Sequence, residues 1–288
     1  MSPPRAGLTT GPISRAVLSL ALPMMGSSTL QTIQSMVDMY FVGSLGHEAI
    51  AAVGMAGTAL MVVIAIFSGI DVATAAMVAR AIGAGDPLRA SHVAGQSLLL
   101  TLALSVVGGA AGYGAALWIM QALGGAPDVA LLGAGYLRIS FAGLFFMCAM
   151  FVTNGALHGA GDAVTPLLLG VLTTLINCVL TPAMIKGWCG LPAMGVDGSS
   201  LSTVISRALA LSVALWLLFR GKLRLRLRLD SFAPNGRAIW RLVSIGFPGS
   251  LQMSVRMLMN VAMMAIVAQF GSQIVAAFIP VDHSFSPS

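Results

Sequence analysis

The stretch "LSLALPMMGSSTLQTIQSMVDMYFVGSLGHEAIAA", residues 18–52, has a second copy in "VSIGFPGSLQMSVRMLMNVAMMAIVAQFGSQIVAA", residues 243–277. A shift of 225 residues aligns the two copies without a gap, and seven positions are then identical. Pro23 matches Pro248, so the most disruptive residue for a helix falls at the same place in both copies. A repeat of this kind predicts a chain that is built from copies of one structural unit.

The composition indicates that this unit lies in lipid. Of the 288 residues 57% are hydrophobic and 8% are charged, and the mean hydropathy is +0.93. Long apolar runs recur along most of the chain, which excludes a soluble domain. They indicate membrane-spanning helices, because a spanning strand would be about ten residues of alternating polarity. We therefore predict an all-α polytopic membrane protein. Its apolar segments lie approximately at 16–42, 50–79, 93–121, 129–157, 163–185, 194–219 and 242–270.

The spacing of the copies predicts their relative direction. The second copy begins six helices after the first, an even number, so both should cross the membrane in the same direction, as in transporters with two parallel six-helix lobes. We expect the chain to stop just after the second lobe begins, which leaves the small-residue faces around Gly246, Gly249 and Gly271 with nothing to pack on. The predicted divisions are a six-helix N-lobe at 1–220, a basic cytoplasmic interlobe linker at 221–241, the first C-lobe helix at 242–278 and a divergent polar tail at 279–288.

The distribution of Lys and Arg predicts the orientation in the membrane. Eleven of them precede the first helix, flank the 2/3 loop or lie in the 6/7 connection, whereas the opposite loops hold only Lys186. The positive-inside rule therefore predicts a cytoplasmic N-terminus. We interpret the alternating stretch "RGKLRLRLRLD", residues 220–230, as a topology-setting and solvated linker rather than as a lipid-headgroup or nucleic-acid patch. The other three basic residues, Arg138, Arg207 and Arg256, lie within apolar segments.

Polar residues form stripes along three of the predicted helices. Spacings of three and four residues place the members of each stripe on one helix face. Three such stripes suggest a shared water-filled cavity, although Ser and Thr in membrane helices also bond to their own backbone or join neighbouring helices. The stripes are Ser27, Gln31, Gln34 and Asp38 in the first helix, Thr173, Asn177 and Thr181 in the fifth, and Ser199, Ser202, Thr203 and Ser206 in the sixth.

Asp38 is the strongest candidate for a functional residue. A carboxylate at bilayer depth costs about 2.5 to 3.5 kcal/mol on insertion scales, so it usually has a function. It is either a site for a hard cation or a proton, or a residue that reaches the outer interface near Val42. Asn154 is a candidate for the same cavity, whereas we interpret Asp71 as a residue near the lipid headgroups. Pro23 is either a hinge or a packing kink.

Several motifs together resemble the multidrug and toxic compound extrusion (MATE) family. They are "ALPMM" followed by "VDMYFVGSLGHEAIAAVG", "MVARAIGAGDPLRA", "GALHGAGDAVTP" and "GVDGSSLSTVISR", and they cover the chain to about Ala277. The resemblance implies a twelve-helix antiporter in the plasma (inner) membrane that expels cationic amphipathic compounds in exchange for Na⁺ or H⁺.

The resemblance also implies a cation or proton site in the N-lobe. The family's site corresponds to Asp38, Asn177 and Thr203, and the proline that bends the first helix in some members corresponds to Pro23. The sequence departs from the family at Thr181, where some branches carry a second acid, so the coupling ion stays open. With Asn177 and Thr203 as the donors that the sequence offers nearby, we expect a mobile cation to neutralise Asp38.

The sequence also bears on other possible functions. No nucleophile and base pair or metal cluster occurs at membrane depth, so we expect no enzyme, no catalytic or metal-binding residues and no cofactor other than the coupling ion. The expected partners are small cationic substrates, membrane lipids and a C-lobe in the same chain, and not nucleic acid. The alternatives are a lipid-linked oligosaccharide flippase of the same superfamily, which would tend to have a more cationic cavity, and a non-functional truncated fragment.

Overall fold

The computed structural model describes residues 13–188, 192–221, 223 and 225–268, with the backbone alone at 13–20, 229, 257, 258 and 260–268. In this part of the chain all regular structure is helical, which confirms the predicted fold class. The helices are α1 (Ile13–Gly43), α2 (His47–Gly83), α3 (Pro87–Ala122), α4 (Pro127–Ala142), α5 (Leu144–Gly159), α6 (Val164–Lys186), α7 (Val196–Arg220), the short 3-10 helix η2 (Leu229–Phe232) and α8 (Gly236–Ala268).

One predicted segment, 129–157, is two helices instead of one. The chain bends by 54° between α4 and α5, at Gly143. A Cβ atom on Gly143 would collide with the side chain of Val204 in α7, so the bend lies where another helix approaches the bare backbone. Among the described residues, α2, α3, α6 and α7 are long and apolar enough to cross a membrane, and the bent pair is a fifth candidate.

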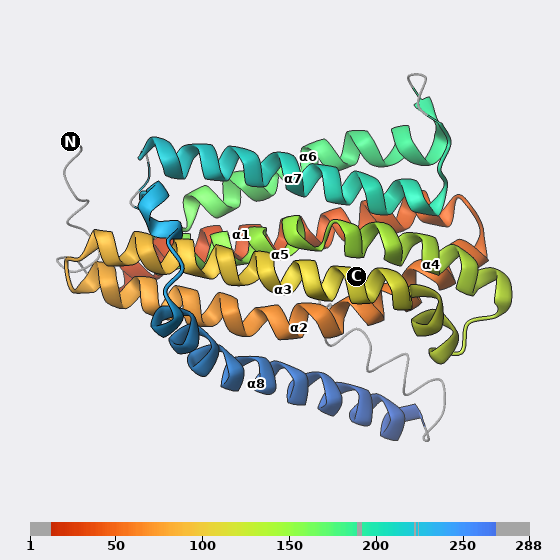
Figure 1. The fold of residues 1–288 in the computed structure, drawn as a ribbon. Helices are drawn as coiled ribbons and strands as arrows, with labels where there is room; N and C mark the ends of the chain where they lie inside the picture. The colour runs from red at the N-terminus through yellow and green to blue at the C-terminus, as the bar shows by residue number, and fades with distance from the viewer. Residues whose placement is uncertain (1–12, 189–191, 222, 224, 269–288) are drawn as a thin grey trace.

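The helices form a bundle in which the first helix lies beside two separate pairs. Helices α6 and α7 pack together on one side, and α2 and α3 pack together on the other (Figure 1). Helix α1 contacts mainly α6 and α2, whereas α5 contacts α2, α3 and α7. Small residues permit this close packing, as at Gly198 against the backbone of Met184 and at Gly159 against that of Ala75. The arrangement places the polar faces of α1, α6 and α7 toward a common interior.

The first parts of the two repeat copies, 18–43 and 243–268, lie in α1 and α8, and both helices have their proline inside, at Pro23 and Pro248. They run in the same direction, as the parallel repeat predicts (Figure 1). The expectation that the small-residue face of the second copy has nothing to pack on was wrong for Gly246 and Gly249. Both pack against Gly69 of α2, where a Cβ atom would collide with the Gly246 carbonyl. Gly271 lies outside the described residues.

A hydroxyl group secures the contact between α2 and α8. Ser250 Oγ donates a hydrogen bond of 2.8 Å to the carbonyl of Ile66. The prediction failed because α8 packs on α2, which is far away in the sequence. The alignment of the two repeat copies contains no information about this contact.

The basic linker before α8 is only half solvated, in contrast to our interpretation. Leu225 and Leu227 are buried in the core while Arg226 and Arg228 are exposed, so the alternating sequence has one apolar and one charged side. Gln96 of α3 fastens the segment: its Nε2 donates to the carbonyls of Ser231 (3.0 Å) and Ala233 (2.7 Å), and its Oε1 accepts from the Asn235 amide at 2.9 Å.

Two glycine–aspartate turns end helices in the same way. Gly85 and Gly161 have φ values of 73° and 75°, a backbone conformation that suits glycine. The aspartate that follows each glycine then accepts hydrogen bonds from the start of the next helix. Asp86 Oδ1 accepts from the Arg89 amide at 2.9 Å, and Asp162 Oδ1 accepts from the Thr165 amide at 3.0 Å. These are the "GAGD" turns of the sequence.

Candidate functional site

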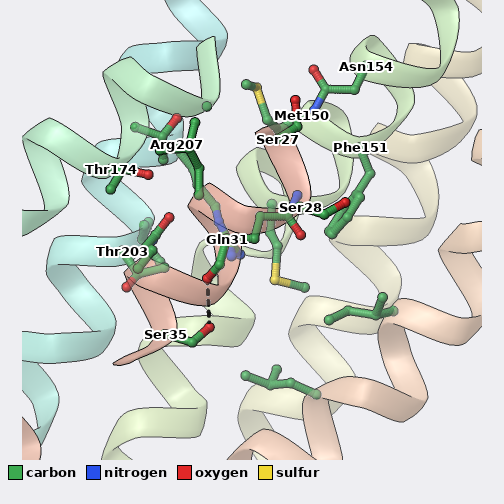
Figure 2. Close-up of a pocket in the computed structure, with 18 of the residues that line it drawn as sticks. Ser27, Ser28, Gln31, Ser35, Met150, Phe151, Asn154, Thr174, Thr203 and Arg207 are labelled. Carbon is green, nitrogen blue, oxygen red and sulfur yellow. Dashed lines mark hydrogen bonds between the residues drawn. The ribbon is translucent and has the colours of Figure 1, made fainter. Parts of the chain in front are cut away.

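A cavity of about 600 Å³ lies between α1, α2, α4, α5, α6 and α7. The wall includes residues from all three predicted polar stripes and the three predicted cavity residues, Gln31, Gln34 and Asn154. Figure 2 shows how the side chains from α1, α5, α6 and α7 surround it. Of the predicted ion-site residues, Asp38 and Thr203 line the cavity directly. Asn177 and Thr181 are fully buried behind them.

The four predicted ion-site residues are joined by hydrogen bonds. Thr181 Oγ1 donates to Asp38 Oδ1 at 3.1 Å, which links α6 to α1. One turn earlier in α6, Asn177 Nδ2 donates to Thr203 Oγ1 of α7 at 3.2 Å. The structure thus brings together side chains from three helices that the sequence separates by up to 165 positions. Thr181, which departs from the family pattern, is the residue that contacts the carboxylate.

Each hydroxyl group in this network has one proton and can donate only one hydrogen bond. Ser202 Oγ lies 2.8 Å from Thr181 Oγ1 and 2.8 Å from the Ser199 carbonyl, while Thr203 Oγ1 also donates to that carbonyl at 3.1 Å. If Ser202 donates to Thr181, then Thr181 is free to donate to Asp38, and the Ser199 carbonyl still has Thr203. The hydroxyl chain therefore aims one donor at the carboxylate.

One acceptor of the site has no partner within the described residues. Asn177 Oδ1 is buried and accepts no hydrogen bond, although Nδ2 of the same amide is bonded. Asn177 lies one helical turn before Thr181, on the helix face that holds the Asp38 contact. Carboxylate and amide oxygens are ligands that hard cations prefer. The Asp38 end of the cavity thus presents oxygen atoms of this type.

Most of the hydroxyl groups in the stripes bond to their own helix. Ser27 donates to the Pro23 carbonyl (3.0 Å), Thr173 to that of Leu169 (2.8 Å) and Ser206 to that of Ser202 (2.7 Å). This is the alternative that the sequence left open for them. Because these donors are already used, the hydroxyls shape the wall of the cavity and offer a ligand mainly their oxygen lone pairs.

Asp71 lies in the cavity wall, whereas the sequence interpretation placed it near the headgroups. Its side chain lies against Gly155 of α5, where any Cβ atom would collide with Asp71 Oδ1. Asn154 and His158 of α5 line the same part of the cavity. The interpretation considered α2 alone, whereas the cavity wall on α2 extends from Gly57 to Asp71.

Arg207 is a charged residue of the cavity wall that the sequence analysis did not name as a site residue. Its side chain points from α7 into the cavity, toward Gln31 (Figure 2). Its charge acts on Asp38, yet no ion pair within 4.0 Å joins it to any carboxylate of the described residues. The signal was present in the sequence, because Arg207 follows Thr203 by four residues and so continues the α7 stripe. The cavity is therefore less acidic than the stripes suggested.

Prolines interrupt the backbone ladders of the two helices that meet at Asp38. Pro23 lies inside α1 and Pro182 lies inside α6, directly after Thr181. A proline has no N–H, so the carbonyl one turn earlier loses its helical donor. Helix α1 is continuous through Pro23, and whether this residue acts as a hinge stays a prediction.

Comparisons with known proteins agree with this architecture. A family model described as MatE matches residues 23–183, more than half of the chain. The chain is 30% identical over 273 residues to a probable multidrug resistance protein, YoeA, of Bacillus subtilis, covering 92% of this chain and 58% of that protein. It is 29% identical to a protein named FAD transporter of Shewanella oneidensis, covering 95% of this chain and 61% of the relative.

A solved structure of a MATE protein in complex with MaL6 superposes with a TM-score of 0.85 at 30% identity, and the match covers 94% of this chain and 60% of that one. The chain thus spans about three fifths of the length of the proteins that it matches. The family match, the helical bundle and the polar cavity lead to one assignment: the chain belongs to the MATE family of multidrug and toxic compound extrusion transporters.

Proposed function

We propose that the chain is part of a secondary antiporter that exports cationic amphipathic compounds in exchange for Na⁺ or H⁺. The observation that carries this proposal is the cavity of about 600 Å³ with Asp38 in its wall and the Thr181 hydroxyl bonded to that carboxylate at 3.1 Å. A carboxylate inside the membrane that faces water is able to exchange an ion. Several relatives are named as probable multidrug resistance proteins, which supports the substrate class.

The coupling follows from competition for one carboxylate. When Asp38 is charged, a small cation or a proton binds there with help from the Asn177 oxygen, and an entering cationic substrate makes that binding less favourable. Release of the ion and binding of the substrate are then linked. The chain's own residues supply the acceptors, while the membrane gradient supplies the energy.

The test is transport by the full gene product in proteoliposomes. Tetraphenylphosphonium should be expelled when an inward gradient of Na⁺ or of protons is imposed, and the gradient that works identifies the ion. Vesicles with collapsed gradients are the control. Transport that is independent of both gradients would contradict the antiport mechanism.

Arg207 favours a second candidate, the export of a compound with an acidic group. A guanidinium in a cavity binds carboxylate or phosphate in a two-pronged geometry. One relative carries the name FAD transporter, and FAD contains a diphosphate. A lipid-linked oligosaccharide, the substrate of the flippase alternative, would use the same contact. Competition of FAD or of inorganic diphosphate with tetraphenylphosphonium in the proteoliposomes separates this candidate from the first.

We further propose that the N-terminus faces the cytoplasm in the plasma membrane. Arg80 and Arg89, at the α2–α3 turn, lie at the end of the bundle where η2 packs on α3, and Lys186 lies at the opposite end of α6. The sequence assigns eleven basic residues to the first end and one to the second. A phosphatase fused after Asn235 should be silent, and an active fusion there would reverse the topology.

A further inference from the structure

The Asp71 end of the cavity holds three buried acceptor atoms without a partner in the described residues. They are Asp71 Oδ1, Asn154 Oδ1 and His158 Nδ1. All three residues line the same cavity as Asp38. Buried polar atoms are nearly always hydrogen-bonded in folded proteins, so three such atoms in one place need a physical reason.

The geometry brings these atoms to one junction between α2 and α5. Asn154 and His158 are four residues apart in α5 and therefore lie on the same face of that helix. Asp71 of α2 rests against Gly155, the residue after Asn154, at a point where a Cβ atom would displace its carboxylate. Glycine at this position is what lets the carboxylate reach the α5 backbone.

The α1 hydroxyl groups near this end of the cavity already donate to their own helix. The closest hydroxyls in sequence on the α1 side of the cavity are those of Ser27 and Ser28, and they donate to the carbonyls of Pro23 (3.0 Å) and Met24 (3.2 Å). The charge of Arg207 acts on Asp38, at the other end. A ligand that carries its own donors would therefore satisfy the three atoms.

We propose that Asp71, Asn154 and His158 bind the ammonium group of substrates that carry N–H donors. A protonated amine offers up to three N–H groups and a positive charge, which match one carboxylate oxygen, one amide oxygen and one imidazole nitrogen. His158 accepts at Nδ1 when its proton is on Nε2. A quaternary ammonium carries the same charge without a donor, so this end should distinguish the two. The inference rests on the proposed export of cationic compounds and adds a selection among them.

The test uses a matched pair of fluorescent cations, 1-naphthylmethylammonium and its N,N,N-trimethyl analogue. Binding to the purified protein in lipid nanodiscs is followed by fluorescence. The primary ammonium should bind about tenfold more tightly than the analogue, because hydrogen bonds to charged groups are the strong ones. Asp71→Asn, which keeps the size of the side chain, should weaken primary ammonium binding about tenfold and remove the preference.

Two further variants keep the result interpretable. Asp128→Asn removes an exposed acid in the first turn of α4, outside the cavity, and should leave both affinities unchanged. If Asp71→Asn does not fold, His158→Leu replaces it, and the preference should fall by about threefold because one neutral acceptor is lost. Equal binding of the two cations by the wild type, or an unchanged preference in the folded variant, overturns the proposal.

Tetraphenylphosphonium separates this inference from the proposed function, since it has no N–H group. If its gradient-driven export is intact while the naphthyl pair shows no preference, only the ammonium site is wrong. If neither tetraphenylphosphonium nor the naphthyl cations are exported under any gradient, the proposed antiport function itself is contradicted.

Discussion

The two ends of the cavity contain one carboxylate each, and the two carboxylates differ in the groups that surround them. Asp38 accepts a hydrogen bond from Thr181 and feels the charge of Arg207. Asp71 Oδ1 has no hydrogen-bond partner in the described residues, and the same is true of Asn154 Oδ1 and His158 Nδ1 nearby. Counted from the α1–α2 turn at 1.5 Å per residue, the two carboxylates are roughly 25 to 30 Å apart along the bundle.

The difference shows two ways of keeping a carboxylate inside a membrane protein. At Asp38 fixed groups of the protein stabilise the charge, so a binding ion has to compete with them. At Asp71 the only protein group that stabilises the charge is the Gly155 backbone, and Oδ1 has no hydrogen-bond partner in the described residues, so a bound ligand recovers the free energy of unpaired acceptors. The first arrangement suits an ion that must leave readily, and the second suits selection among substrates.

The expectation that a mobile cation neutralises Asp38 stays a prediction, but the surroundings of the carboxylate differ from those expected. It rested on donors from Asn177 and Thr203, yet these two side chains bond to each other, and the contact to the carboxylate comes from Thr181. Arg207 adds a permanent positive charge that the first-helix pattern did not reveal. A mobile ion at Asp38 works against this charge.

The largest effect is expected from Asp38→Asn. The amide has the size of the carboxylate but no charge, so membrane insertion should be kept while gradient-driven efflux falls to the level of cells without the protein. Efflux of tetraphenylphosphonium at matched protein levels is the measurement. Wild-type efflux by this variant would leave Asp38 as an interfacial residue and would remove the functional difference between the two ends.

Thr181→Val is expected to give the next largest effect. It removes the fixed donor to Asp38 but keeps the shape of the side chain, and a hydrogen bond to a charged group contributes about 1.5 to 3 kcal/mol, or roughly tenfold or more in ion affinity. Thr32→Val is the matched control, because the Thr32 hydroxyl bonds to the Ser28 carbonyl on an exposed face of α1. The ion concentration for half-maximal transport should shift for Thr181→Val only. Equal shifts in the two variants would point to a general loss of helix stability.

Much of the fold was predictable from the sequence because lipid imposes long apolar runs and turn residues between them. The helical class and the parallel direction of the repeat are confirmed. The bend at Gly143 was not predictable, since the apolar run continues across it and only the approach of Val204 explains it. The contact of α8 with Gly69 also depends on packing between distant segments.

The candidate site was predicted where helical spacing alone determines it. Gln31 and Asp38 lie on one face of α1, and they do share the cavity. The positions of Asp71 and Arg207 were not predicted, because each is an isolated charge in the interior of its helix. What such a charge contacts depends on which helix lies opposite. The roles of all these residues remain predictions for the experiments described.

Arg207→Gln should strengthen cation binding at the Asp38 end of the cavity. Without the guanidinium, a cation at Asp38 no longer meets a positive charge, and at the effective dielectric constant of proteins two charges beyond direct contact interact by on the order of 1 to 2 kcal/mol. Cation binding should therefore strengthen about fivefold, measured with radioactive sodium and by proton release in weak buffer. Arg138→Gln is the control, because Arg138 lies over the Tyr113 ring outside this cavity. Weaker binding in Arg207→Gln would assign the guanidinium a direct role in holding the ligand.

The smallest effect is expected from Ser27→Ala, although Ser27 lines the cavity between the two carboxylates. Its hydroxyl donates to the Pro23 carbonyl at 3.0 Å, and the backbone amide one turn later still serves that carbonyl when the hydroxyl is absent. No ligand-binding donor is lost, so the transport rate and both naphthyl affinities should change by less than about twofold, which is the scale of a solvated, locally bonded hydroxyl. A tenfold loss would mean that Ser27 turns away from its own helix to bind the substrate. The cavity would then have a third binding region between its ends, and the division into a protein-stabilised and a ligand-stabilised carboxylate would be too simple.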